Sequence, residues 1–161
     1  MKIFISHQRA DSQAAALIAE RLRRVHNVES YLDVVDPSIS DTGEALAEHV
    51  RDELGKCTEL LAVVSEATAS SWWVPWEIGV ATEKEYALAT YSNGQVKLPE
   101  YLKKWPYLRS HLDLDKYVLQ AKALQASRVV MESLSTVTAK ADVRRDALRN
   151  FYKNLRSDLG Q

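Results

Sequence analysis

The sequence predicts an α/β protein whose core is a doubly wound parallel sheet. Segments that read as strands alternate with amphipathic helical segments three times in succession, the pattern of parallel strands joined by crossover helices. Residues 59–65 are apolar through their middle, as expected of a strand that helices cover on both faces. The chain has 161 residues, 46% of them hydrophobic, which favours one compact domain with a sizeable core.

The first strand, helix and strand follow from hydrophobic spacing. Residues 2–6 have the length and apolar character of a buried strand, and residues 28–35 predict a second one. Between them, residues 11–25 predict a helix. Its apolar residues at helical spacing are Ala14, Ile18, Leu22 and Val25. Residues 36–41, rich in Asp, Ser and Pro, predict a loop.

The rest of the chain continues the alternation and then changes character. Helices are expected at residues 44–56 and 75–84, and strands at residues 59–65 and 86–91. Residues 98–114 have no sustained period and predict loops with one short edge strand. Helical patterns return at residues 115–134 and 141–159. The last of these helices is expected to pack on the domain or on a partner.

The composition and charge of the chain argue against several classes of function. The formal charge of -1 provides no basic field for nucleic acid, and no apolar run approaches the roughly 18 residues of a membrane span. Cys57 is the single cysteine, so no internal disulfide and no cysteine-based zinc site are expected. We expect no metal ligand cluster. With no cationic leader at the N-terminus, these features predict a cytoplasmic protein.

The glycines are too scattered for a phosphate-binding loop. They stand at positions 43, 55, 79, 94 and 160, so neither a dinucleotide fingerprint nor a P-loop can be drawn. This excludes a hydride-transfer Rossmann enzyme and a P-loop NTPase. No nucleophile elbow supports a catalytic triad.

Polar clusters follow three of the predicted strands. Ligands of open α/β sheets bind outside the carboxyl ends of the strands, so these clusters are the candidate site. The first contains Ser6, His7, Gln8, Arg9 and Asp11. The second spans residues 33–42, and the third spans residues 65–77.

The third cluster contains the segment SSWWVPWE, in which three tryptophans and a glutamate meet where a strand gives way to a helix. Pro75 suits a first helical turn, which would place Glu77 near the positive end of the helix dipole. A fixed carboxylate beside indole rings suits a cationic, aromatic ligand. The local pattern equally allows a glutamate that only stabilises its helix and tryptophans that pack in the core or contact a partner.

The segments FISHQRAD, YLDVVD and LLAVVSEATASSWWVPWEIGVA, in this order, resemble a TIR domain over about residues 1–117. Ser71, Trp73 and Glu77 match the S-x-W-x-x-x-E arrangement of that family. The resemblance implies a flavodoxin-like three-layer sandwich with a five-strand parallel sheet and additional C-terminal helices. We expect the TIR domain at residues 1–135 and a helical extension packed on it at residues 136–161.

The resemblance also implies an activity and a set of site residues. Many TIR domains cleave NAD⁺, and Glu77 takes the place of their catalytic glutamate. The substrate-binding positions implied are Ser6, His7, Arg9, Asp11, Asp33, Ser65, Ser71 and Trp73. The loop implied in self-association contains Val35, Asp36, Pro37 and Ser38, and residues 33–42 lack the Arg-Asp and Pro-Gly pairs usual there.

A free-standing bacterial TIR domain of this kind is similar to those of Thoeris-type antiphage systems, which make a nucleotide signal for a separate effector. The implied products are nicotinamide with ADP-ribose or a cyclic isomer, from NAD⁺ as substrate and without another cofactor. Copies of the chain are expected to associate through TIR–TIR contacts. Two alternatives remain open: a non-catalytic TIR adaptor, and an enzyme like the nucleoside deoxyribosyltransferases.

Overall fold

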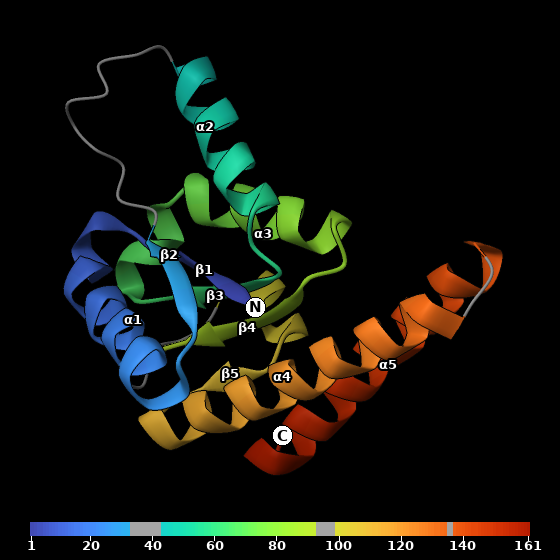
Figure 1. Cartoon of the computed structure of the whole chain (residues 1–161). Helices are drawn as coiled ribbons and strands as arrows, with labels where there is room; N and C mark the ends of the chain where they lie inside the picture. Colours follow the sequence, from blue (N-terminus) through green and yellow to red (C-terminus); the bar gives the residue numbers. More distant parts are fainter. Residues whose placement is uncertain (33–42, 93–98, 135–136) are drawn as a thin grey trace.

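A computed structural model describes residues 1–32, 43–92, 99–134 and 137–161 (Figure 1). Five strands alternate with helices along this part of the chain. The strands are β1 (Lys2–Ser6), β2 (Glu29–Leu32), β3 (Glu59–Val63), β4 (Ala87–Tyr91) and β5 (Tyr107–Leu108). The α-helices are α1 (Ser12–His26), α2 (Gly43–Gly55), α3 (Trp73–Glu83), α4 (His111–Leu134) and α5 (Val137–Leu159). Short 3-10 turns are η1 (Arg9–Asp11), η2 (Glu66–Ser70) and η3 (Glu100–Lys104).

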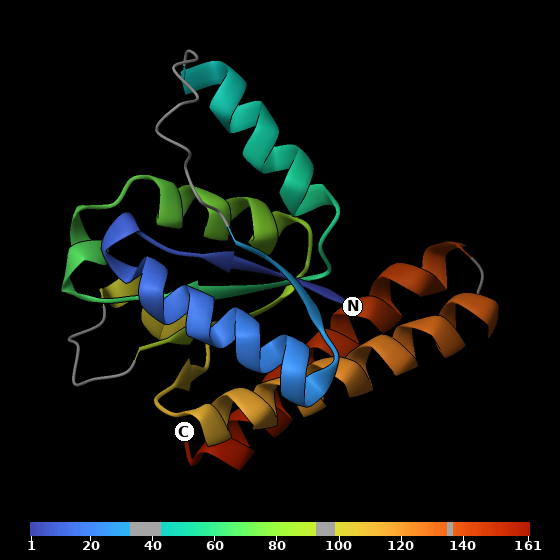
Figure 2. The ribbon, with the colours of Figure 1, turned by 60° about the vertical axis from the view of Figure 1, so that its left-hand side comes forward.

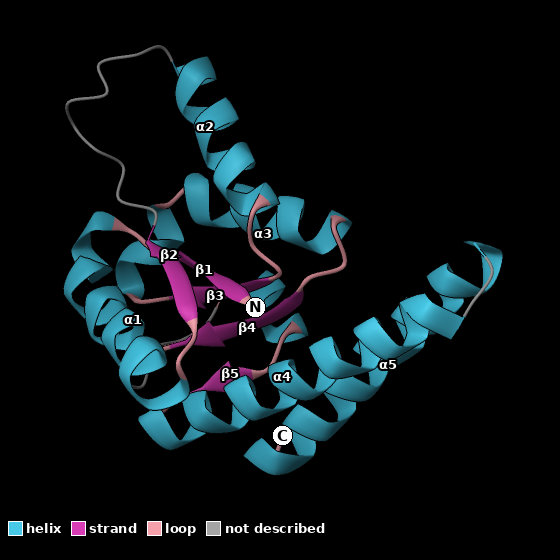
Figure 3. Cartoon of the chain, in the orientation of Figure 1, coloured by secondary structure: helices cyan, strands magenta, loops and turns pink. Residues whose placement is uncertain are grey.

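All the strands are parallel and form one sheet in the order β2-β1-β3-β4-β5 (Figure 3). This is the strand order of a flavodoxin-like fold, and it confirms the fold class predicted from the sequence. The order reverses between β1 and β3, where Ser6 is in register with Ala62. Ligands of such sheets bind at the carboxyl ends of the two strands that flank this reversal.

Helices cover both faces of the sheet, which makes three layers. Side chains of a strand point alternately to its two faces, and in β1 this sends Ile3 and Ile5 to one core and Phe4 to the other. The core that contains Ile3 is closed by α1, α4 and α5. The core that contains Phe4 is closed by α2 and α3. Figures 1 and 2 show these two groups of helices on opposite sides of the strands.

The last two helices form an antiparallel pair whose far end extends beyond the sheet (Figures 1 and 2). Phe151 of α5 joins the core of the domain, with its ring centroid 6.1 Å from that of Tyr117 on α4. The hydroxyl of Tyr152 accepts a hydrogen bond from the backbone N–H of Leu88 at 3.2 Å and donates one to the carbonyl of Tyr86 at 3.3 Å. Helix α5 is therefore attached to the sheet by packing and by hydrogen bonds.

Three helices begin two or more residues earlier than the sequence pattern predicts. Helix α3 begins at Trp73 rather than Pro75, α4 at His111 rather than Asp115, and α5 at Val137 rather than Ala141. The hydroxyl of Ser110 accepts a hydrogen bond from the N–H of Asp113 at 3.2 Å, which caps the start of α4. None of the helices in the described part of the chain combines the length and the apolar character that a membrane-spanning helix needs.

Candidate functional site

Glu77 is the central residue of the candidate site. Its side chain is fully buried although it is polar, and one of its carboxyl oxygens accepts a hydrogen bond from the hydroxyl of Ser6. Ser6 is itself fully buried at the last position of β1. A buried carboxylate is costly unless hydrogen bonds compensate for its lost hydration, so this contact both supports Glu77 and orients it. The structure thus joins two residues that are 71 positions apart in the sequence.

The start of α3 sets the position of Glu77. Ser71 has an extended backbone, and its hydroxyl accepts a hydrogen bond from the N–H of Val74 at 3.2 Å, which is the geometry of a helix cap. Pro75 is the third residue of α3, inside the first turn as predicted, where it breaks no helical hydrogen bond. Glu77 is the fifth residue, just past the first turn, so the helix dipole acts on it less than the hydrogen bond from Ser6 does.

The apolar face of α3 holds the carboxylate against the sheet. Val74, Ile78 and Ala81 are buried in the same core as Phe4 of β1. Glu77 lies on this buried side of the helix, beside Ile78. Because the packing of three apolar neighbours fixes the rotation of α3, the direction of the Glu77 side chain is fixed as well.

The three tryptophans of the SSWWVPWE segment have different environments. Trp72 is 89% exposed, and Trp76 is 36% exposed. Trp73 is half-buried, and its ring meets that of Trp76 edge to face, with centroids 5.6 Å apart and an interplanar angle of 89°. Such a T-shaped pair is a favourable aromatic contact. Trp72 therefore offers a large indole surface to solvent, whereas Trp73 and Trp76 pack on each other.

The segment after β1 is joined to the segment after β3 by a hydrogen bond. The hydroxyl of Ser65 donates a hydrogen bond to a carboxylate oxygen of Asp11 at 2.9 Å. A ring nitrogen of His7, Nδ1, lies 3.1 Å from the carbonyl of Ile5, and the side chain of His7 is buried. Arg9 is exposed. The structure therefore brings Ser6, Asp11 and Ser65 to the carboxyl ends of β1 and β3, where the strand order reverses.

Thr68 completes this arrangement. It lies within the third predicted cluster, residues 65–77, but no role was predicted for it from the sequence. Its hydroxyl accepts a hydrogen bond from the N–H of Ser65 at 2.9 Å, while the hydroxyl of Ser65 accepts one from the N–H of Ala67 at 3.2 Å. This is a capping box on η2, with Thr68 at the position where the usual S/T-x-x-E/Q sequence signature has Glu or Gln. Thr68 holds Ser65 in place for its contact with Asp11.

The remaining predicted residues lie outside the described part of the chain. These are Asp33, expected to bind substrate, and the self-association loop residues Val35, Asp36, Pro37 and Ser38.

The comparisons with known proteins agree with the fold. A family model described as a TIR domain matches residues 3–117. The comparison with curated proteins found no significant match. The matched segment runs from β1 into α4, and so it contains the sheet, Ser6 and Glu77. It covers well over half of the 161 residues. The chain therefore belongs to the TIR domain family.

Proposed function

We propose that this TIR domain cleaves the bond between nicotinamide and ribose in NAD⁺, with Glu77 as the catalytic carboxylate. The observation that carries the proposal is the buried Glu77 carboxylate, held by Ser6 at the point where the strand order reverses. Glu77 also occupies the glutamate position of the S-x-W-x-x-x-E arrangement. A surface glutamate that only stabilised its helix would need neither the burial nor the partner.

The chemistry suits a carboxylate without a general acid. Nicotinamide is bound to ribose as a pyridinium, so when the C–N bond breaks the electron pair returns to the ring nitrogen and the leaving group departs neutral. Positive charge then develops on the ribosyl carbon and its ring oxygen. An oriented carboxylate stabilises this oxocarbenium ion, as it does in glycoside hydrolysis.

The group that captures the ribosyl cation determines the product. Water would add to the ribosyl carbon, lose a proton and give ADP-ribose. An adenine nitrogen or a ribose hydroxyl of the same molecule would instead give a cyclic isomer. Either product would act as a signal for a separate effector in antiphage defence, in a cytoplasmic setting. Association of several copies through TIR–TIR contacts would complete the active site.

The proposal is tested by measuring nicotinamide release. Concentrated protein is incubated with NAD⁺, with and without a crowding agent, and the products are separated by chromatography and identified by mass spectrometry. Glu77→Gln keeps the size of the side chain and an acceptor for Ser6 but removes the charge, so turnover should fall by about 10²-fold or more. Glu83→Gln, an exposed glutamate on the same helix, is the matched control and should keep full activity.

Two other outcomes distinguish the alternatives. If assembled wild-type protein releases no nicotinamide, the chain acts as a TIR adaptor. If deoxynucleosides exchange their bases and NAD⁺ stays intact, the chain is an enzyme of the deoxyribosyltransferase kind. Equal turnover by Glu77→Gln and wild type would show that another residue carries the reaction.

A further inference from the structure

The pair of helices at the C-terminal end carries a surface that the TIR match leaves out. Family similarity ends at residue 117, within α4, so most of α4 and the whole of α5 lie beyond it. The buried positions of α4 end at Leu124 among the residues whose exposure is described. From there the pair extends past the sheet (Figures 1 and 2), and one side of each helix faces solvent.

An apolar stripe runs along the solvent side of α4. Leu119 is 63% exposed and Val130 is 57% exposed, and the exposed residues Ala123 and Ala126 lie between them. The spacing of these four residues alternates between four and three, which is the spacing of a seam between two helices. Leucine and valine exposed to this degree on one line of a helix favour a partner that covers them.

The order of residues in the stripe reads the same from both ends. A large side chain, two alanines and a large side chain follow one another, and both the Leu119–Val130 pair and the Ala123–Ala126 pair are centred between residues 124 and 125. A two-fold axis at this point places Leu119 of one copy opposite Val130 of the other. It also places Ala123 opposite Ala126, where two small side chains allow the helices to approach closely. Such self-complementarity is the requirement for an isologous dimer.

We propose that two copies of the chain associate through α4, antiparallel, about a two-fold axis between residues 124 and 125. The residues of this contact lie beyond the segment that the TIR family model matches. The contact spans about 18 Å of helix, at 1.5 Å per residue. A contact of this length is small for a protein–protein interface, so we expect a weak, reversible dimer with a dissociation constant on the order of 10 µM or above.

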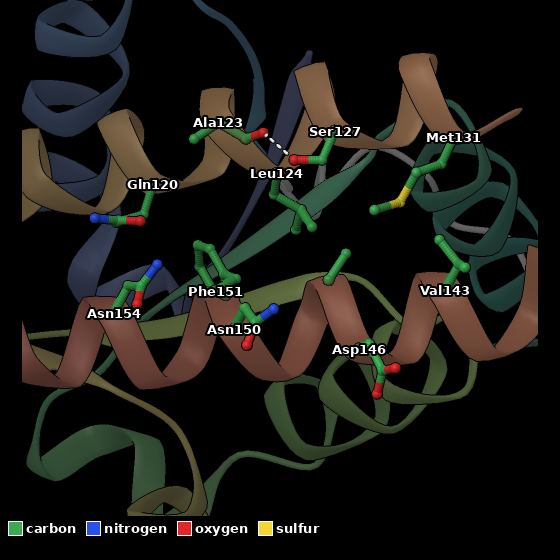
Figure 4. A pocket seen from close by; sticks show the side chains of 11 residues that line it. Gln120, Ala123, Leu124, Ser127, Met131, Val143, Asp146, Asn150, Phe151 and Asn154 are labelled. Atoms are coloured by element: carbon green, nitrogen blue, oxygen red, sulfur yellow. Dashed lines mark hydrogen bonds between the residues drawn. The ribbon is translucent and has the colours of Figure 1, made fainter. Parts of the chain in front are cut away.

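A groove beside the stripe provides room for the partner's side chains (Figure 4). The groove lies between α4 and α5, has a volume of about 270 Å³, and includes Ala123 of the stripe in its lining. Leu124 and Phe151 form its floor, and Met131 and Val143 line one end. In the antiparallel arrangement, Leu119 of the second copy lies next to that end, against Met131.

The charges of the segment do not oppose this contact. Residues 119–130 contain two charged side chains, Lys122 and Arg128. Each donates a hydrogen bond to a backbone carbonyl of its own chain: Lys122 to His26 at 2.6 Å and Arg128 to Glu85 at 2.9 Å. The two-fold axis places Lys122 opposite Ser127 rather than opposite another cation. Neither cation therefore meets a like charge across the seam.

The test is the oligomeric state of the full chain, measured by sedimentation over protein concentrations from about 1 to 500 µM, which bracket the expected dissociation constant. We expect the wild type to pass from monomer to dimer in this range. Ala126→Glu places a charge at the centre of the contact and should weaken the dimer at least tenfold. Ala16→Glu makes the same change at an exposed position of α1 and should leave it intact. A monomeric wild type at every concentration, or a dimer insensitive to Ala126→Glu, would overturn the proposal.

Cross-linking tests the direction of the helices. Chains with Ala123→Cys mixed with chains with Ala126→Cys should form a disulfide-linked heterodimer faster than either forms a homodimer. Cys57 is buried and does not compete. Faster linking of Ala123→Cys chains to one another would contradict the antiparallel arrangement. Neither experiment measures NAD⁺ turnover, so the results of both experiments are independent of the proposed activity.

Discussion

Glu59 and Glu77 are both fully buried, and they lie at opposite ends of the same sheet. Glu59 is the first residue of β3, and Glu77 contacts the last residue of β1. A carboxyl group at the carboxyl ends of parallel strands is in the place where such sheets bind ligands, whereas Glu59 lies at the other end of its strand. The two glutamates are therefore expected to respond differently to substitution.

Replacing Ser6 should impair the activity that we propose for Glu77. Ser6→Ala removes the hydroxyl that donates to the carboxylate, so Glu77 loses both a partner and its orientation. We expect nicotinamide release to fall about tenfold or more, and the free energy of unfolding to fall by about 1–3 kcal/mol. Steady-state kinetics and urea denaturation measure the two effects. Ser12→Ala, which removes an exposed hydroxyl bonded to the carbonyl of Arg9, is the control. Unchanged turnover in Ser6→Ala would show that Glu77 does not need this partner.

Replacing Glu59 should relieve a cost of folding. Burial raises the pKa of Glu59 above its ordinary value of 4.5, so this group favours the folded state at low pH, and that contribution is lost as the pH rises through the raised pKa. Glu59→Gln keeps the hydrogen bond from Gln125 and removes the charge. The stability of the variant relative to wild type should therefore increase from pH 4.5 towards pH 7. A tenfold change in proton affinity corresponds to about 1.4 kcal/mol.

The measurement for Glu59 is the free energy of unfolding in urea at several pH values. Glu83→Gln, on an exposed position, is the control and should follow the wild-type pH dependence. A Glu59→Gln variant whose relative stability decreases with rising pH would mean that the ionised carboxylate stabilises the fold.

The opposite pH dependence is expected at Asp115. Two hydrogen bonds from Arg21, at 2.9 and 2.6 Å, and a contact with His26 hold the pKa of Asp115 below its ordinary value of 3.8. A lowered pKa gives stability that is present above pH 3.8 and is lost as the pH falls through the folded-state value. Solvent screening limits the contribution of this partly exposed group, so Asp115→Asn should cost about 0.5–1 kcal/mol at pH 7, and the cost should shrink below pH 3.8. Acid unfolding followed by circular dichroism measures this, with the exposed Asp142→Asn as control.

Cys57 should be unreactive in the folded protein. It is 3% exposed, and burial raises the pKa of its thiol to about 11. Because only the thiolate reacts, alkylation at pH 8 should be about 10²-fold slower in the native protein than in denaturant. Mass spectrometry after iodoacetamide treatment gives both rates. Similar rates in the two states would show that the thiol is accessible.

Phe151 tests whether α5 is part of the core of the domain. Its side chain is 3% exposed, and its ring centroid is 5.1 Å from that of Tyr152. Phe151→Ala should lower the free energy of unfolding by about 3–5 kcal/mol in a single transition. Lys153→Ala, an exposed change on the same helix, should alter it by less than about 0.5 kcal/mol. A variant that lost only the helical signal of α5 would show that this helix folds separately.

The periodic spacing of hydrophobic residues in the sequence predicted the helices and strands that are long or that are buried on both faces. Strand β3 is buried at every position, and its apolar run is visible in the sequence without other information. Strand β5 has two residues, too few for any period to appear. The start of α4 was missed because residues 98–114 lack periodic spacing, although Ser110 and Asp113 have the spacing of a helix cap.

The contact between Ser6 and Glu77 could not be predicted from local sequence patterns. Each residue was predicted for the site, but their bond depends on β1 and β3 being neighbours, which is a property of strand order. Arg21 shows the same limit. It lies in the helix predicted at residues 11–25, and no local spacing connects it with Asp115, to which the fold brings it across 94 residues. Hydrophobic spacing determines which side of an element faces the core, and the order of strands determines which residues meet.

The cap at Ser71 makes the length of the segment before Glu77 a requirement of the site. Each residue turns an α-helix by about 100°. One residue inserted between Ser71 and Val74 would leave α3 two choices: to keep its capped start and rotate the carboxylate away from β1, or to keep its apolar face and lose the cap. Loop-length variants of this segment would therefore lose either the orientation of the carboxylate or the cap of α3, while retaining every side chain of the site.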